Sequence, residues 1–500
     1  METTEFIIRD GVLEKYVGSG GEVTVPETVH TIGAGAFENV CGVTFVTLPH
    51  GLNAVNRQGF ASCVDLKGVA IPPSVTSVGD YAFRDCQALT EVDFGESVVS
   101  IGDGAFENCC SLRSVCLPDT VESIGVGAFQ SCEALETVHL SASLKELKRY
   151  TFNGCRLISG IVIPDGVIGI GDYCFASLGD GLTDITIPAS VKYIGCYAFR
   201  GCVSLARVTF SGGVKTVDNG AFWGCVSLAE IVLPEGLSTL GNNVFSGCSM
   251  LKNAVIPRSI KKIPEKCFYF CTSLDGFRIH ETVTEIGIGA FMFCYSLSGI
   301  SLPLGLKSIG TSAFCGCKSL KSICIPTSVE RLGNFAFYKC DELMRIAMRK
   351  DLMKSLGYEI VGRDIWYFLD RLQGKTEAED TKPSIVLEGA DQQSLLIQIS
   401  NMDEDEFLSY FGTRKKHKKV KPPEVDIETD IAEWSKVIGD NALECFKMAL
   451  DDVRFYRFAA ERGLITVDIA GEMLEHTRSV ECRAILFECR RKLTEKEERI

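Results

Sequence analysis

A phenylalanine recurs at a nearly constant interval through the first two thirds of the chain, and this interval constrains the fold more than any other feature. The recurring residues are Phe37, Phe60, Phe83, Phe106, Phe129, Phe152, Phe175, Phe199, Phe222, Phe245, Phe268, Phe291, Phe314 and Phe337. Every step is 23 residues except the step from Phe175 to Phe199, which is 24. A fixed period of this length is the signature of a repeat architecture, in which each unit packs only against its neighbours. We therefore expect a solenoid of about 14 coils of 23 residues.

Each coil contains a pattern that is typical of a short β-strand. A leucine usually lies six residues after the phenylalanine, and apolar residues follow at nine and eleven residues, as at Val115 and Leu117. This alternation predicts a half-buried strand, and a proline such as Pro118 often ends it because proline has no N–H to donate. A later glycine marks a turn that needs positive φ or a close approach. The A-F-x-x-C segment is expected to form one helical turn on the convex side.

The repeated pattern (L)xxVxLPxxVxxIGxxAFxxCxSL resembles the BspA-like, or Treponema pallidum-type, leucine-rich repeat family over about residues 20–348. The resemblance implies a leucine-rich-repeat solenoid with a parallel sheet on its concave face. It also implies a protein-binding role, because the family includes bacterial surface adhesins. It does not identify the partner of this chain.

Twelve of the 23 cysteines occupy one position of the repeat, three residues after the phenylalanine. They are Cys63, Cys86, Cys109, Cys132, Cys155, Cys202, Cys225, Cys248, Cys271, Cys294, Cys317 and Cys340. A position that is filled once per coil predicts a stacked internal ladder of thiols, in which cysteine acts as a small buried hydrophobe. Disulfides or a metal site are the alternatives, but a row of single thiols does not converge on one point as zinc ligands must. Buried thiols in this number favour a reducing compartment.

The density of charge divides the chain near residue 350. Charged residues make up 62 of the first 350 residues and 54 of the last 150. The repeat stops after Leu343, and the apolar segment that follows fits a cap over the last coil or, alternatively, an aromatic patch for a partner. The expected divisions are an N-terminal cap (1–20), the solenoid (21–348), a C-terminal cap (349–372), a linker (373–384), a small mixed element (385–411), a charged linker (412–426) and a helical C-terminal domain (427–500).

The last of these divisions has the periodicity of helices. Apolar residues recur at spacings of three or four at Leu443, Phe446, Leu450 and Val453. This spacing predicts an amphipathic helix, and two more helices are expected around Ile469 and over residues 479–493. The series is loosely similar to the ankyrin-like helical tails of some bacterial leucine-rich-repeat proteins. We therefore expect a small, mainly α-helical domain after the solenoid.

Two positions of each predicted strand point outward, eight and ten residues after the phenylalanine. Concave leucine-rich-repeat faces are the usual ligand surface, so the charged and polar residues at these positions are the candidate binding residues. They are Glu91, Asp93, His139, Asp184, Arg207, Glu230, Arg278 and Arg345. The alternative is that many of them are solvated strand residues without a ligand.

No motif in the sequence indicates catalysis, a cofactor or a metal. The chain has no Walker A loop, G-x-S-x-G, H-E-x-x-H or paired C-x-x-C motif. The recurring I-G-x-G-A-F segment is interpreted as a turn that needs glycine, not as a dinucleotide-binding fingerprint. We expect no catalytic residues, no cofactor and no bound metal. An enzyme would need a cryptic site within the C-terminal 150 residues, and this is the least favoured alternative.

The charge and the termini bear on partners and location. A net charge of −14 argues against a general nucleic-acid binder, and the basic run Arg414–Lys421 lies between acidic stretches, which favours a solvated linker. We find neither a signal-peptide pattern nor an apolar run of membrane-spanning length. We expect a cytoplasmic, non-catalytic scaffold that binds protein partners. An exported or cell-surface adhesin is the alternative, and the oligomeric state is left open.

Overall fold

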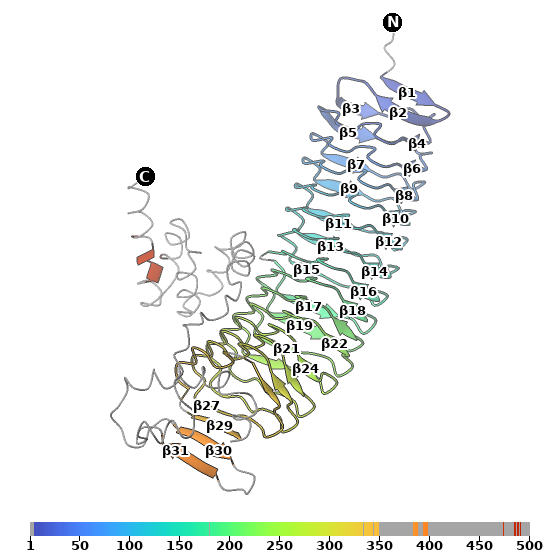
Figure 1. The fold of residues 1–500 in the computed structure, drawn as a ribbon. Helices are drawn as coiled ribbons and strands as arrows, with labels where there is room; N and C mark the ends of the chain where they lie inside the picture. Colours follow the sequence, from blue (N-terminus) through green and yellow to red (C-terminus); the bar gives the residue numbers. More distant parts are fainter. Residues whose placement is uncertain are drawn as a thin grey trace. The chain divides into compact units, whose positions relative to one another are not determined.

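The computed structural model describes residues 5–179, 181–333, 335–343, 345–349, 384–388, 394–398, 474, 485–486, 488–489 and 491. The chain divides into two compact units, unit 1 over residues 1–225 and unit 2 over residues 226–500. Nine of the recurring phenylalanines lie in unit 1 and five in unit 2. Both units confirm the predicted solenoid, because their coils stack with parallel strands (Figure 1).

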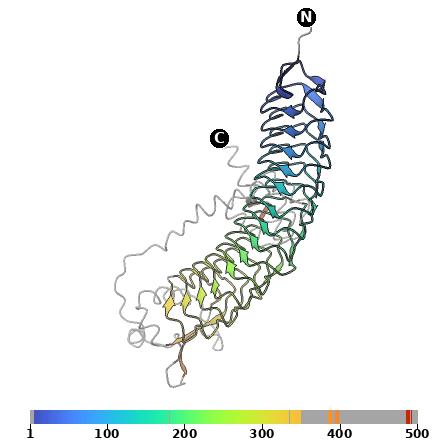
Figure 2. The ribbon, with the colours of Figure 1, turned by 90° about the vertical axis from the view of Figure 1, so that its right-hand side faces the viewer.

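Unit 1 begins with an antiparallel hairpin of β1 (Phe6–Arg9) and β2 (Val12–Tyr16), within the predicted N-terminal cap. Its coils then supply two series of strands, which run along the stack (Figure 2). The long series is β3 (Gly21–Thr24), β5 (Val43–Thr47), β7 (Gly68–Ala70), β9 (Glu91–Asp93), β11 (Ser114–Cys116), β13 (Thr137–His139), β15 (Gly160–Ile161), β17 (Asp184–Ile187) and β19 (Arg207–Phe210). The short series is β4 (Thr31–Ile32), β6 (Ala54–Val55), β8 (Ser77–Val78), β10 (Ser100–Ile101), β12 (Ser123–Ile124), β14 (Glu146–Leu147), β16 (Gly169–Ile170), β18 (Tyr193–Ile194) and β20 (Thr216–Val217).

Unit 2 repeats both series. The long strands are β21 (Glu230–Val232), β23 (Asn253–Val255), β27 (Ser322–Cys324) and β29 (Arg345–Arg349), and the short ones are β22 (Thr239–Leu240), β24 (Lys262–Ile263), β25 (Glu285–Ile286), β26 (Ser308–Ile309) and β28 (Arg331–Leu332). Beyond the last coil, β30 (Ser384–Glu388) pairs in parallel with β29 and antiparallel with β31 (Ser394–Gln398). These two strands lie at the start of the predicted mixed element. The predicted cap beyond Arg349 and the linker 412–426 lie outside the described residues. In the predicted helical domain, only a few helical positions are described.

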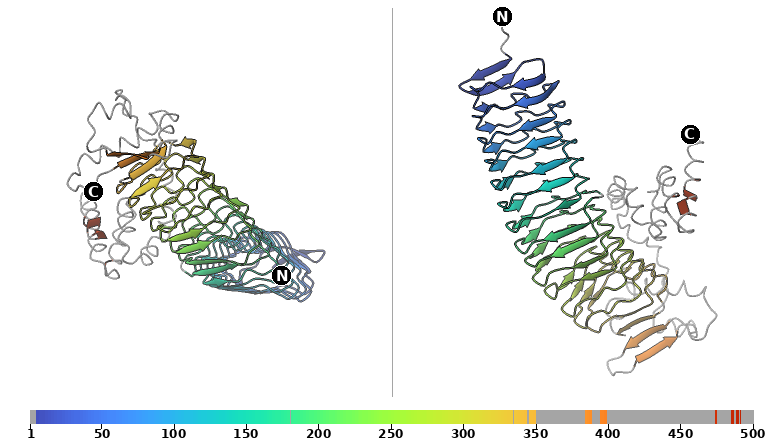
Figure 3. Two further views of the ribbon diagram at one scale, coloured as in Figure 1. Left: turned by 90° about the horizontal axis from the view of Figure 1, so that it is seen from below. Right: turned by 180° about the vertical axis from the view of Figure 1, so that it is seen from behind.

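The core of each coil is built on the recurring phenylalanine, whose ring stacks on the rings of the coils before and after it. The centroids of successive rings lie 4.7–5.9 Å apart in unit 1 and 5.3–5.7 Å apart in unit 2. Phe106, for example, is fully buried between Phe83 and Phe129. Seen from behind, the strands of successive coils follow the same order (Figure 3), which keeps equivalent side chains in register.

The A-F-x-x-C segment is not the helical turn that the sequence suggested. In every coil, the residues two before and two after the phenylalanine have positive φ, as at Tyr81 (54°) and Asp85 (59°). Alternate N–H groups therefore point along the stack, and the Phe83 N–H donates to the carbonyl of Ala105 in the next coil at 2.7 Å. Bonding between coils thus competes with a helix. It also explains why glycine is the most frequent residue at these two positions, since it adopts positive φ without steric cost.

The glycine after the short strand is needed for close approach rather than for positive φ. A Cβ added at Gly102 would lie 2.5 Å from the Asp80 nitrogen, and one added at Gly125 would lie 2.3 Å from the Asp103 nitrogen. Such distances leave no room for a side chain between neighbouring coils. The glycine therefore sets how tightly adjacent turns can pack.

Candidate functional site

The structure places the predicted binding residues of unit 1 on the outward side of the long strands. Glu91 and Asp93 lie in β9, His139 in β13, Asp184 in β17 and Arg207 in β19, and all five side chains are exposed. The alternate side chains of the same strands are buried, as the period-two pattern predicts. Their exposure makes a binding role possible, and that role stays a prediction.

In unit 2, Glu230 in β21 and Arg278 are likewise exposed. Arg345 occupies the equivalent backbone position in β29, where it pairs in register with Ser322 of β27. Arg278 lies in a segment without an assigned strand.

Two of the predicted residues contact each other. Asp184 and Arg207 are register partners on β17 and β19, and the Arg207 Nε lies 3.3 Å from the Asp184 Oδ1. Thr183 donates a hydrogen bond of 2.8 Å to the other carboxylate oxygen. The side chains of the ion pair are 71% and 54% exposed, so the pair contributes little to stability, about 1 kcal/mol at most. Its charges are available to a ligand.

An exposed valine lies on this surface between His139 and the ion pair. Val162 directly follows β15, and its side chain is 82% exposed. A Cβ added at Gly160, on the same strand, would meet nothing within 4 Å, so the surface around the valine is open. Val162 occupies one of the outward positions that the repeat predicts, ten residues after Phe152, and the valines at the same position in unit 2, Val232 and Val255, are 58% and 43% exposed.

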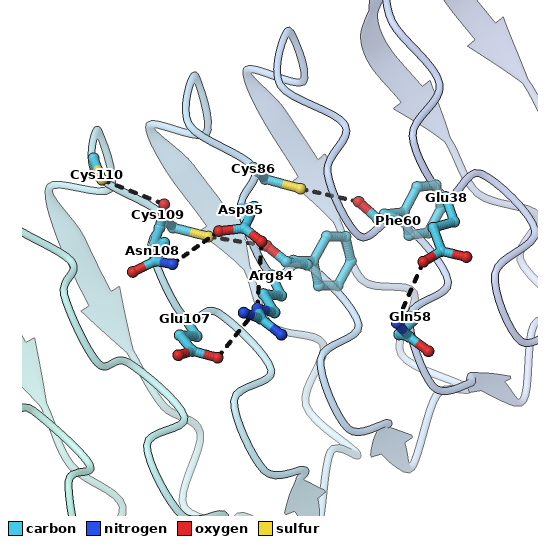
Figure 4. A network of polar contacts seen from close by, with 11 residues as sticks. Glu38, Gln58, Phe60, Arg84, Asp85, Cys86, Glu107, Asn108, Cys109 and Cys110 are labelled. Carbon is cyan, nitrogen blue, oxygen red and sulfur yellow. Dashed lines mark hydrogen bonds and ion pairs between the residues drawn. The ribbon is translucent and has the colours of Figure 1, made fainter.

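The cysteine ladder forms as the sequence predicts, and the structure adds a hydrogen bond to it. The Cys86 Sγ lies 3.1 Å from the carbonyl oxygen of Phe60, to which it donates (Figure 4). Equivalent bonds of 3.0–3.2 Å are made by Cys63, Cys109, Cys132, Cys155, Cys202, Cys225, Cys271, Cys294, Cys317 and Cys340. Burial raises the pKa of the Cys63 and Cys202 thiols to about 12. The ladder is therefore neutral at pH 7 and is a structural feature rather than a reactive one.

The surface beside this ladder carries a polar network in the early coils. Arg84 Nε lies 3.3 Å from carboxylate oxygens of both Asp85 and Glu107, and Asn108 donates to Asp85 at 2.8 Å. These residues lie one or two positions after the phenylalanine (Figure 4). We call the side chains at these two positions the turn face. Sequence reasoning assigned it no role.

A column of aromatic rings in unit 1 was also missed. The rings of Tyr150, Tyr173 and Tyr197 stack with centroids 5.1 and 5.0 Å apart. The guanidinium of Arg149 lies 4.8 Å from the Tyr150 ring, and that of Arg200 lies 5.9 Å from the Tyr197 ring. Tyrosine at one repeat position in three successive coils was the signal that could have revealed this column.

The described part of the chain contains neither a metal-binding cluster nor a membrane-spanning helix. No group of three or more His, Cys, Asp or Glu side chains there could hold a metal ion. No helix within the same residues is both long and apolar enough to cross a bilayer.

The sequence and the structure match known leucine-rich-repeat proteins, although no curated protein matches the sequence. A leucine-rich-repeat protein from Bacteroides ovatus is 30% identical, with a TM-score of 0.54, and the match covers 69% of this chain and 83% of that one. A leucine-rich cell surface protein from Faecalibacterium prausnitzii is 21% identical, covering 82% and 96%, with a TM-score of 0.37. A leucine-rich-repeat protein from Treponema pallidum is 22% identical, covering 59% and 90%, with a TM-score of 0.24.

The family assignment rests on the repeat region itself. The profile of the BspA type leucine-rich repeat region, with six copies, matches residues 15–115, 55–179, 169–298 and 284–360. These stretches overlap and include every recurring phenylalanine. The chain belongs to the BspA-type leucine-rich repeat family.

Proposed function

We propose that this protein is a non-catalytic scaffold that binds a protein partner through the outward side of the long strands in unit 1. The observation that carries the proposal is the exposed Val162, which lies among the polar residues His139, Asp184 and Arg207. Protein interfaces commonly have an apolar centre and a polar rim. Burying the exposed valine against a partner is favourable because its apolar surface leaves water. The charged side chains around it favour one orientation of the partner.

A second property of this surface supports recognition rather than structure alone. The inward residues are apolar in coil after coil, whereas the outward ones change from acidic (Glu91, Asp93) to imidazole (His139) and to an ion pair (Asp184, Arg207). Stability of a repeat protein depends on the inward residues and the contacts between neighbouring coils. The outward residues are therefore free to specify a ligand.

The Val162→Lys substitution should abolish partner binding without unfolding the protein. We expect at least a tenfold loss of the proteins that the full-length chain captures from a lysate of its source cells, because a lysine cannot enter an apolar interface centre. The matched control is Val64→Lys, which changes a 36% exposed valine outside the strand surface. Equal capture by wild type and Val162→Lys would contradict the proposal. If Tyr173→Ala reduced partner capture and Val162→Lys did not, the binding site would lie on the aromatic column of Tyr150, Tyr173 and Tyr197.

We also propose that the scaffold works in the cytoplasm. No disulfide joins the cysteines in the described part of the chain, and Cys41, Cys110 and Cys116 are exposed. Exposed thiols persist where thiol-reducing systems operate, whereas oxidising compartments favour disulfides. An exported or cell-surface adhesin is the alternative.

Labelling of intact cells should distinguish these locations. We expect a membrane-permeant maleimide to modify Cys41, Cys110 and Cys116, and a membrane-impermeant maleimide to modify none of them until the cells are lysed. Peptide mass spectrometry measures both. Modification by the impermeant reagent on intact cells would support the adhesin alternative.

A further inference from the structure

The turn face changes its character along the repeat region, from polar in the early coils to largely buried from Trp223, near the end of unit 1, onward. At the position directly after the phenylalanine, early coils of unit 1 have Glu38, Arg84, Glu107, Gln130 and Asn153, which are exposed or half-buried. The equivalent residues in unit 2 include Tyr269, Met292 and Cys315, and their side chains are 2%, 3% and 5% exposed.

The aromatic residues of this surface pack on one another. The Phe270 ring lies 4.6 Å from the rings of both Tyr269 and Phe293, measured between centroids. Together with Met292 and Cys315 these three residues form what we call the turn-face cluster. The cluster is apolar at positions that carry an ion-pair network in unit 1, where Arg84 binds Glu107. A surface of this composition needs cover to stay out of water.

In unit 1, flanking coils leave a side chain at the equivalent position half-buried. Gln130 has nearly the length of Met292, occupies the same repeat position and is flanked by coils on both sides, yet it remains half-buried. Met292 is only 3% exposed. We infer that part of the additional burial in the later coils comes from chain that does not pack against the turn face of the early coils.

The C-terminal segment, residues 427–500, has the composition to supply it. Its apolar residues recur at helical spacing. At the helical positions that are described, Leu486 is fully buried and Leu474 is 7% exposed. Glu488 and Arg491, by contrast, are exposed and bonded to each other at 2.9 Å. The helical stretch that contains Leu486 and Glu488 therefore has a buried side and a solvated side.

We propose that the turn-face cluster of unit 2 is the docking site for the chain's own C-terminal segment, which lays the apolar face of its helices on the cluster. The segment has 16 acidic and 12 basic residues, and Lys266 lies beside the cluster, with its Nζ 5.7 Å from the Tyr269 ring. The charges of the two surfaces are thus compatible. Release of the segment would uncover aromatic side chains of the kind that dominate protein interfaces. This docking site is separate from the Val162 surface, so either proposal can fail alone.

Cys315 reports on this contact within the full-length protein. In wild type, N-ethylmaleimide should modify Cys315 slowly compared with the exposed Cys110, as followed by peptide mass spectrometry. Leu486→Asp should speed the modification of Cys315 at least tenfold and leave the ladder thiol Cys317 unmodified. The matched control is Glu488→Gln, on the solvated face of the same helix, which should change nothing.

The reciprocal experiment changes the cluster and observes the segment. Met292→Lys should speed amide hydrogen exchange in residues 427–500, whereas Gln130→Lys, at the same repeat position in unit 1, should not. Slow modification of Cys315 in Leu486→Asp would overturn the proposal, because a part of the protein other than the C-terminal segment would then be covering the cluster. Protection of Cys315 that weakens on dilution would also overturn it, since a second copy would provide the cover. If Leu486→Asp also exposes Cys317 to modification, the coils around Cys317 have unfolded, and this variant cannot test the docking. The test is then hydrogen exchange in Met292→Lys, where an unchanged exchange rate in residues 427–500 would contradict the proposal.

Discussion

The repeat region should unfold when the pH is raised from 8 to about 10, without denaturant. Burial raises the pKa of the ladder thiols: that of Cys63 reaches about 12, and those of Cys86, Cys109 and Cys271 lie well above their ordinary value. In the unfolded chain a cysteine titrates near pH 8.5. The folded state therefore retains protons that the unfolded state loses, and stability falls as the pH rises from about 8.5 towards the folded pKa.

The effect is large because it is repeated. Eleven ladder thiols donate to the carbonyl of a phenylalanine in a neighbouring coil. Burial raises the pKa of eight of these thiols, those of Cys63, Cys86, Cys109, Cys132, Cys202, Cys271, Cys294 and Cys317. At one pH unit above the unfolded pKa, each of the eight costs ~1.4 kcal/mol of stability, so together they cost ~11 kcal/mol. A typical domain has a free energy of unfolding of only about 5–15 kcal/mol. The transition should be seen by circular dichroism in thermal scans at pH 7, 8, 9 and 10, as a fall in Tm that steepens above pH 8.5.

A serine variant isolates the contribution of the thiols. Cys86→Ser, Cys109→Ser and Cys132→Ser together retain a donor at each position but remove three thiols whose pKa burial raises. The combined variant should be less stable than wild type at pH 7. Its free energy of unfolding should nevertheless fall less steeply above pH 8.5, by about 4 kcal/mol per pH unit. An unchanged slope would show that other groups control the alkaline transition.

The repeat made most of this architecture predictable from the sequence. A residue that returns every 23 positions must return to the same place in each coil, which fixed the ladder of Phe106 and Cys109 and the exposure of outward residues such as Asp184. The same step joins Asp184 to Arg207, so their contact follows from the register. What the period could not reveal was the direction of the N–H groups. Residues such as Ala82, Phe83 and Cys86 have helical spacing, but bonding to the next coil imposes alternating φ instead.

The candidate surfaces were predictable only where they repeat. The Tyr150, Tyr173 and Tyr197 column has a regular spacing and was visible in principle. Val162 lies at an outward position that the repeat predicts, as do the exposed Val232 and Val255, so its exposure was predictable but a role in binding was not. Met292 is 3% exposed at a repeat position that is polar in several early coils, and no local pattern predicts that burial. Sites made by one exceptional coil therefore require the structure.

Phe106→Ala should produce the largest loss of stability among single substitutions in unit 1. The ring is fully buried, lies 5.2 and 5.3 Å from the rings of Phe83 and Phe129, and meets the edge of Phe94 at 5.5 Å. Removing a buried phenylalanine side chain costs about 3–5 kcal/mol, because the lost burial adds to the cost of the cavity. Urea denaturation measures the loss. The matched control is Phe45→Ala, which truncates a ring that is 43% exposed and should cost roughly 1 kcal/mol or less.

The location of the damage distinguishes a stacked column from an ordinary core. Since each coil contacts only its neighbours, the cavity at Phe106 should weaken the two interfaces beside it and leave distant coils intact. Hydrogen exchange in Phe106→Ala should therefore accelerate first in the coils of Phe83, Phe106 and Phe129, while the amides around Phe314 in unit 2 keep their wild-type rates. Uniform acceleration across both units would instead mean that the repeat region unfolds as one cooperative block. Local acceleration would show that each phenylalanine stabilises chiefly its own pair of interfaces, which is why the residue is needed in every coil.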